Sequence, residues 1–250
     1  MAATTHTTHR TPTTLKTMCN DTKTLLSLFR LSQLSDSTLP VGGFSFSLGL
    51  EAAVEQGMVG SVEELEAYTT RALHNAAECD GVALLEAYRA ATLGDHSRLV
   101  DADHRVASFK SGEEQRAMTL KMGRRLADLL RSICPTPLTT EFHRWATEGV
   151  TPCTYPVAQA VAGVALSTGE EALFAAHLYG VASTIVAASL RLMRLSHFDT
   201  QRILYRLAPL CERLYDHYRE LSLEQMASFS PTLELTASLH ERGRGRLFMN

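Results

Sequence analysis

Apolar positions recur at intervals of three and four along most of the chain, which is the period of an amphipathic helix. The clearest run extends from Glu113 through Met118, Met122 and Leu126 to Ile133, before two prolines end it. No segment shows a convincing strand-like alternation, and no motif repeats at a fixed period. The pattern therefore predicts an all-α fold, a single-domain helical bundle of about ten helices.

The expected helices follow from this periodicity and from local start and stop signals. They cover residues 25–35, 48–57, 62–78, 97–109, 113–133, 141–148, 157–167, 169–195, 200–221 and 223–229, with a further apolar run that stops at Gly94. A capping-box spacing occurs at Ser61–Glu64, Ser111–Glu114, Thr168–Glu171 and Ser222–Gln225. The two small-residue helices between Pro156 and Leu195 are expected to form the hydrophobic centre.

The segment from Ala172 to Leu190 has His177 as its only titratable residue and is about long enough to span a bilayer. Acidic residues precede it and arginines follow it, which are the signs that a helix dipole favours at its two ends. We interpret it as a buried central helix whose small residues let neighbours approach closely. The alternative is a helical membrane component.

Composition narrows the possible partners and compartment. The 250 residues are 45% hydrophobic and carry a net charge of -3, so no basic field recruits nucleic acid or an anionic bilayer. Five scattered cysteines without a C-x-x-C pair suit a reducing compartment, and we expect a cytoplasmic protein.

The N-terminal segment differs from the rest of the chain. Residues 1–23 are Thr-rich, with Asp21 as their only acid, and are expected to be a disordered tail, with a transit peptide as the alternative. One helical domain is expected from residue 24 to residue 250.

The segment at residues 35–51, SDSTLPVGGFSFSLGLE, places Pro40, Gly42 and Gly43 in an otherwise helical pattern. It lacks the G-x-S-x-G of a nucleophile elbow and the lysine of a phosphate-binding loop. Proline fixes one dihedral angle and glycine permits positive φ, so we interpret the segment as a structural corner that leaves Phe44 free to pack. Ser47 is placed to cap the helix that carries Glu51.

Candidate metal ligands gather at Asp95, His96, Asp101, Asp103 and His104. An alternative function is a metal-dependent hydrolase that uses Asp101, Asp103 and His104 with Glu114. Because Arg98 and Arg105 lie among these residues, the default interpretation is a solvated, salt-bridged helix surface.

The C-terminus combines arginines with large apolar residues. Leu233, Leu235 and Leu239 have helical spacing, and the chain then continues as HERGRGRLFMN from His240. Basic tails are usually solvated, but one that ends in Leu247, Phe248 and Met249 is typical of a segment that docks on a partner. We expect a docking tail at about residues 240–250.

Several of these segments together resemble the UreF family of urease accessory proteins. Residues 34–51 resemble the family's N-terminal signature, although Phe46 stands where the family usually has histidine. Later blocks follow in the family's order: Met122–Arg125, Tyr155–Val157, Ala187–Leu192 with Gln201, Ser230–Pro231, His240–Arg242 and Arg246–Phe248. The resemblance extends from about Leu25 to the C-terminus.

The resemblance implies a protein that is not an enzyme and is commonly a homodimer. It implies partners UreD (called UreH in some organisms), the GTPase UreG and apo-urease, in which a lysine is carbamylated and nickel inserted. No cofactor is expected to be tightly bound, because UreG binds the GTP and nickel is handled by the complex. No metal ligand and no catalytic residue is assigned to this chain.

The partner-binding residues are predicted from the corner and the tail together. Arg191 either caps the end of its helix or anchors the tail. The full predicted set is Pro40, Gly42, Gly43, Phe44, Ser47, Glu51, Arg191, Gln201, His240, Glu241, Arg242, Arg246, Leu247 and Phe248.

Overall fold

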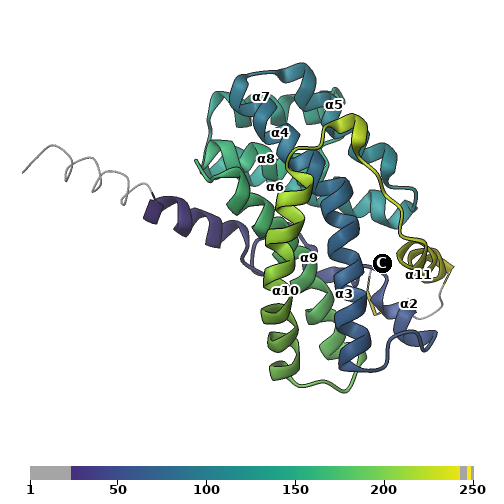
Figure 1. Cartoon of the computed structure of the whole chain (residues 1–250). Coiled ribbons are helices and arrows are strands. Elements are labelled where there is room, and N and C mark those ends of the chain that lie inside the picture. The colour runs from purple at the N-terminus through teal and green to yellow at the C-terminus, as the bar shows by residue number, and fades with distance from the viewer. Residues whose placement is uncertain (1–23, 243–246, 249–250) are drawn as a thin grey trace, which may run out of the picture.

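Figure 1 presents a computed structural model of the chain, in which residues 24–242 and 247–248 are described. The regular elements in these residues are all helical, and no strand occurs among them, which confirms the predicted all-α fold. The Thr-rich tail predicted at residues 1–23 lies outside the described residues.

Residues 24–34 form the first helix. The α-helices that follow are α2 (Leu50–Glu55), α3 (Val62–Ala76), α4 (Val82–Leu93), α5 (His96–Phe109), α6 (Glu113–Ile133), α7 (Pro137–Glu148), α8 (Tyr155–Ala165), α9 (Glu170–Leu192), α10 (His197–Tyr218) and α11 (Pro231–Arg242). Short 3-10 turns occupy Gly43–Ser45 (η1) and Leu223–Gln225 (η3), and a π-helical turn, Ala77–Gly81 (η2), joins α3 to α4.

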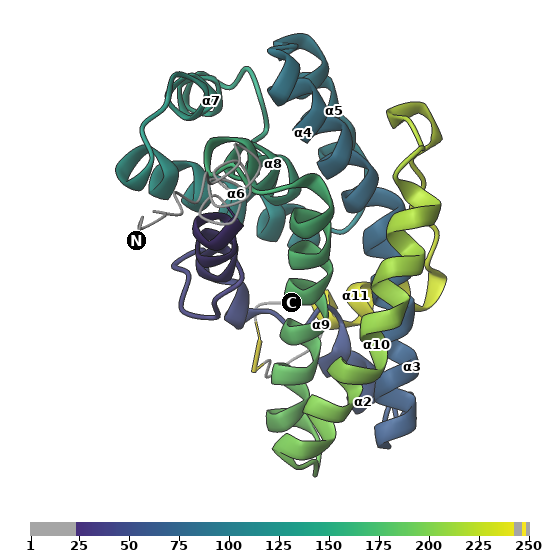
Figure 2. The same ribbon diagram turned by 60° about the vertical axis from the view of Figure 1, so that its left-hand side comes forward.

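The helices form two connected groups. In Figure 1, α3, α9 and α10 lie side by side in the lower half, and α9 packs against both of the others. In the upper half, α8 packs between α4 and α6, while α5 and α7 flank these two helices. Figure 2 shows α2 and α11 beside the middle of α9, close to the last described residues.

The predicted hydrophobic centre is confirmed at α8 and α9. Residues 156–163 of α8 are all buried, and α8 contacts α4, α6, α7 and α9. In α9, Leu173, Phe174, Leu178 and Ile185 are buried. This helix is long and apolar enough to cross a membrane, the only such helix in the described residues, and half of its most apolar window is buried inside the protein. A core helix of a soluble protein has the same properties.

Two of the four predicted capping boxes form. Ser61 accepts from the Glu64 amide while the Glu64 carboxylate accepts from the Ser61 amide, and Ser222 pairs with Gln225 in the same way. The predictions at Ser111 and Thr168 are wrong. Their helices begin one residue later, after Gly112 and Gly169, and neither has a side-chain cap.

Other boundaries also differ from the periodicity. The helix predicted at 141–148 begins at Pro137, because Thr136 and Thr139 make a capping box and proline suits the first helical position. The helix predicted at 223–229 is wrong, since only the single turn η3 forms there before Pro231 starts α11. The helix predicted to continue to residue 195 ends at Leu192, because the backbone of Met193 has an extended conformation.

The Met122–Arg125 block brings α6 against the segment that precedes α8. A Cβ on Gly123 would lie 1.9 Å from the Cys153 carbonyl oxygen, so only glycine fits. The same segment is held by buried Asp103, which accepts from the backbone amides of Cys153 at 2.6 Å and Thr154 at 2.8 Å and from the hydroxyls of Thr151 and Thr154. Burial raises the pKa of Asp103, although these four donors oppose the shift.

We therefore expect Gly123→Ala to lower the free energy of unfolding by about 2 kcal/mol, because the added methyl group overlaps backbone that cannot move alone. The matched control is Gly180→Ala in α9, where a Cβ meets nothing within 4 Å. The control is expected to be neutral or to stabilise by up to about 1 kcal/mol through helix propensity. Urea unfolding followed by circular dichroism measures both changes, and equal effects of the two substitutions would contradict this account of the contact.

Candidate partner-binding site

The glycine-rich segment forms the corner that the sequence predicts. Gly42 has a φ of +87° and precedes turn η1, while the exposed Pro40 lies just before it. Gly49 has a φ of +81°, and a Cβ there would lie 2.7 Å from the Thr236 hydroxyl and 2.9 Å from the Tyr68 hydroxyl. The chain therefore turns into α2 at a position where both the backbone angle and the available space require glycine.

The turn brings Glu51 into the protein interior at the start of α2. Its backbone N–H donates to the buried Ser47 hydroxyl at 3.4 Å, although the helix formally begins after Gly49. The Glu51 side chain is only 3% exposed. A buried carboxylate of this kind is costly unless several donors satisfy its oxygens.

The first donor is His240, near the end of α11. Its Nε2 lies 2.9 Å from Glu51 Oε2, and its Nδ1 lies 2.9 Å from Glu114 Oε2 on α6. The imidazole is buried, and it joins three segments that are far apart in the sequence. A hydroxyl chain supports the same junction, since Tyr68 donates to the Leu48 carbonyl at 2.8 Å and lies 3.3 Å from the Thr236 hydroxyl of α11.

The other donors are backbone amides of the C-terminal segment. The Leu247 N–H donates to Glu51 Oε1 at 2.7 Å, and the Phe248 N–H donates to Glu51 Oε2 at 3.1 Å. The Phe248 side chain is 5% exposed, and the Arg191 guanidinium lies 4.2 Å from the centre of its ring. Of the two roles predicted for Arg191, the structure supports an anchor for the tail.

These contacts determine the electrostatics of Glu51. Burial by itself would raise the pKa of the carboxyl group, but the amide donors and His240 outweigh burial, so the pKa lies below its ordinary value. Glu51 is therefore an anion at neutral pH, with three hydrogen bonds to its two oxygens. We name the group formed by Glu51, Glu114, His240, Leu247, Phe248 and Arg191 the tail latch.

The structure brings some of the predicted partner-binding residues together, places others apart from them, and leaves four undescribed. Glu51, Arg191, His240, Leu247 and Phe248 meet in the tail latch, with Ser47 at its base. Pro40, Gly42 and Gly43 lie in the corner, and Gln201 is exposed on α10 without a described contact to the latch. The side chains of Phe44, Glu241 and Arg242 are not described, and Arg246 lies outside the described residues. Whether any of them contacts a partner stays a prediction.

Glu114 is the latch residue that the sequence analysis assigned elsewhere. Its spacing from Ser111 suggested a helix cap, and its charge suggested a metal ligand, but its carboxylate faces His240 of α11. Tyr68 and Thr236 were also missed, because each looks like an ordinary core or helix residue in the sequence. Only the pairing of distant helices shows these roles.

A cavity of about 400 Å³ lies behind the corner, with Gly43 and Leu48 in its wall. Its polar lining includes an ion pair between Lys110 Nζ and Asp80 Oδ1 at 2.6 Å. It also includes His177, whose Nδ1 lies 2.8 Å from the side-chain oxygen Oε1 of Gln159, and burial lowers the pKa of this imidazole. Within the described ranges, no group of three or more His, Cys, Asp or Glu residues is arranged to hold a metal ion.

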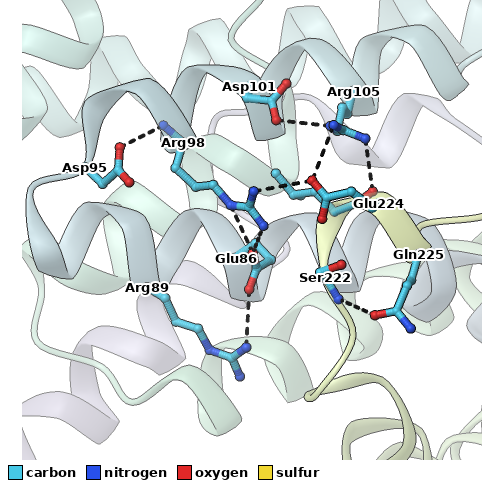
Figure 3. A network of polar contacts seen from close by, with 10 residues as sticks. Glu86, Arg89, Asp95, Arg98, Asp101, Arg105, Ser222, Glu224 and Gln225 are labelled. Carbon is cyan, nitrogen blue, oxygen red and sulfur yellow. Dashed lines mark hydrogen bonds and ion pairs between the residues drawn. The ribbon is translucent and has the colours of Figure 1, made fainter.

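The rival metal cluster does not assemble. Figure 3 shows Asp101 directed at Arg105, with a distance of 3.1 Å between carboxylate and guanidinium. The two arginines of this surface, Arg98 and Arg105, also reach Glu224, and Arg98 binds Glu86 at 2.6 Å. Asp103 is used inside the fold, and His104 Nε2 lies 3.1 Å from the Val150 carbonyl. The salt-bridged surface is therefore favoured over the hydrolase alternative.

Comparison with known proteins identifies the family of the chain. The UreF family model matches residues 59–208, more than half of the chain. Urease accessory protein UreF 2 of Brucella suis is 42% identical over 228 residues, which cover 91% of this chain and 94% of that relative. UreF 1 of Brucella melitensis is 41% identical over 228 residues, covering 91% and 95%. UreF of Yersinia enterocolitica is 39% identical over 223 residues, covering 89% and 98%. The chain belongs to the UreF family of urease accessory proteins.

Proposed function

We propose that the chain is a non-enzymatic scaffold for urease maturation. It binds UreD (UreH) and recruits the GTPase UreG to apo-urease, where a lysine is carbamylated and nickel is inserted. The observation that carries the proposal is the docked pair Leu247 and Phe248, because the tail latch holds these two apolar residues in a fixed position.

In this proposal, Phe248 anchors the segment and Leu247 contacts the partner. Phe248 is buried and fixes the segment, while the neighbouring Leu247 side chain is 71% exposed. A large apolar side chain held outward by a buried neighbour suits the centre of a protein interface. Holding the peptide in place before binding also reduces the conformational entropy that the complex must lose.

In a scaffold role, the chain itself carries out neither GTP hydrolysis nor tight nickel binding. GTP hydrolysis requires a loop that holds phosphates, and in this proposal UreG supplies it. Nickel is the cargo of the assembly, and this chain holds no cofactor tightly. The protein acts in the cytoplasm as a homodimer, so that one assembly carries two copies of each docking surface.

We expect Arg191→Ala and Phe248→Ala to reduce urease activation at least about tenfold, because each removes one side of the contact that fixes the tail. The assay mixes the protein with UreD (UreH), UreG, GTP, apo-urease, nickel and bicarbonate, and measures both urease activity and the mass of the complex. Arg194→Ala is the matched control, since this exposed arginine lies three residues beyond Arg191 and makes no described contact with the latch.

Normal activation by both latch variants, with the fold intact by circular dichroism, would exclude the docked tail as the working surface. A complex that forms normally but fails to activate urease would instead place the tail in a step after assembly. Failure of the unmodified protein to form any complex would contradict the scaffold function itself.

A further inference from the structure

The cavity behind the corner contains a buried hydrogen-bond acceptor that no described residue satisfies. His177 of α9 is only 4% exposed, and its Nδ1 lies 2.8 Å from Oε1 of Gln159 on α8. A carboxamide oxygen only accepts hydrogen bonds, so Nδ1 carries the ring proton and Nε2 presents a lone pair. Nε2 is buried and has no hydrogen-bond partner among the described residues, and a buried acceptor without a donor is costly.

The environment of His177 keeps this ring neutral. Burial lowers the pKa of the imidazole and outweighs the nearby Asp80 carboxylate, which acts in the opposite direction, while Lys110 adds to the lowering. At neutral pH the ring therefore has one proton, on Nδ1, and a lone pair on Nε2. A ligand that binds at Nε2 must bring an N–H or O–H group.

An ion pair completes the polar part of the cavity. Asp80 comes from η2, a π-helical turn of the kind that is often found at functional sites. Its Oδ1 lies 2.6 Å from Nζ of Lys110, and the two side chains are 16% and 14% exposed. Burial opposes the charge of Lys110, but the negative groups beside it, chiefly Asp80, outweigh burial and raise the pKa of the lysine. The pair therefore stays charged and adds no net charge to the cavity lining.

These polar groups select the charge of a ligand. An anion would face the Nε2 lone pair of His177 and the Asp80 carboxylate, whereas a cation would face the Lys110 ammonium group. Both would be poorly solvated, because the three side chains are largely buried. A neutral molecule that combines a hydrogen-bond donor with an acceptor is therefore favoured.

The remaining lining sets the size and shape of the ligand. The volume of about 400 Å³ lies within the usual range of small-molecule sites. Much of the wall is apolar and includes Leu39, Val41 and Leu204. The exposed residues Asp36 and His197 also line the cavity, so it opens to solvent, where water screens the charge of Asp36. A short apolar group on the ligand would cover the apolar wall.

We propose that this cavity binds a small neutral primary amide. The amide N–H donates to Nε2 of His177, and the carbonyl oxygen accepts from the Lys110 ammonium group, which lines the same cavity. The short apolar chain of the ligand packs against the leucine and valine side chains of the wall. Water alone would satisfy Nε2 but would leave that wall wet, whereas an amide serves both parts of the cavity.

The test measures the binding of propionamide to the full-length protein, labelled with nitrogen-15. NMR spectra of the histidine rings first identify which nitrogen of His177 carries the proton. We expect the Nδ1–H form, and a saturable shift of the Nε2 resonance as propionamide is added, with a Kd of roughly 10 mM or tighter. Backbone amide signals of the residues around the cavity follow binding in the same samples.

Two related molecules test the chemistry of the site. In 2-butanone, which has nearly the same size and shape as propionamide, a methyl group replaces the amide nitrogen, so the molecule cannot donate to Nε2. Propionate replaces the donor with a negatively charged oxygen. We expect each to bind at least about tenfold more weakly than propionamide, because Nε2 is then left without a donor.

One substitution removes the acceptor and keeps the hydrogen bond to Gln159. His177→Asn retains an N–H close to the position of Nδ1 but has no atom at Nε2, so we expect it to bind propionamide at least about tenfold more weakly. His74→Asn changes an exposed histidine on α3 and should leave binding unchanged. Circular dichroism records whether each variant is folded. If His177→Asn does not fold, the comparison of propionamide with 2-butanone in the unmodified protein decides.

The proposal is overturned if propionamide causes no saturable shift up to about 100 mM, which would mean that the cavity holds water only. It is also overturned if 2-butanone binds as tightly as propionamide, if Nε2 carries the ring proton, or if folded His177→Asn binds propionamide as the unmodified protein does. Because all these measurements use the isolated chain, their outcome does not depend on the proposed role in urease maturation.

Discussion

A single buried carboxylate, that of Glu51 in α2, connects the N-terminal part of the fold to α11 and to the last described residues. Its oxygens are deep enough to need several donors, and the donors come from α11 and from the last described residues. None of these bonds is local in sequence, so each closes a long loop of chain. The carboxylate thereby fixes the backbone of Leu247 and Phe248 against α2.

The remainder of the fold gives that carboxylate a fixed position. Gly49 lets the chain enter α2 against the Tyr68 and Thr236 hydroxyls, and α2 and α11 both rest against neighbouring helices. The central helices α8 and α9 present small side chains that allow close packing, and α9 ends at Leu192, one residue after Arg191. A rigid centre, a tight corner and one buried anion together define where the tail lies. Such positioning is what the proposed scaffold role requires of the structure.

Much of this architecture could be predicted from the sequence because the signals are local. The period of apolar residues locates most helices, and the Ser61–Glu64 box marks a start that the structure confirms. Predicted helix boundaries were wrong where capping residues and the apolar pattern indicated different starts. The apolar pattern places the start of α7 at residue 141, whereas the Thr136 cap starts the helix at Pro137. Resemblance to a family predicted Glu51, Arg191, His240 and Phe248 as partner-binding residues. A contact with the tail was considered only for Arg191, and the contacts of Glu51 with His240, Leu247 and Phe248 were not expected.

The site could be predicted only in part because pairing of distant side chains leaves no local pattern. Glu114 has the spacing of a helix cap, yet its carboxylate binds His240, 126 residues away. Asp103 looked like a metal ligand, but it satisfies the amides and hydroxyls of the segment before α8. Both are acids on amphipathic helices, and their roles depend on which donors the tertiary fold brings near.

The central claim is that Glu51 builds the partner surface by docking the tail. The most direct test is the affinity of Glu51→Gln for UreD (UreH), measured by titration calorimetry beside Glu55→Gln, which changes an exposed carboxylate on the same helix. The account predicts binding at least about tenfold weaker for Glu51→Gln and unchanged for Glu55→Gln, because a charged acceptor of two amides is lost. Equal affinity of the two variants, with the tail of Glu51→Gln released, would contradict it.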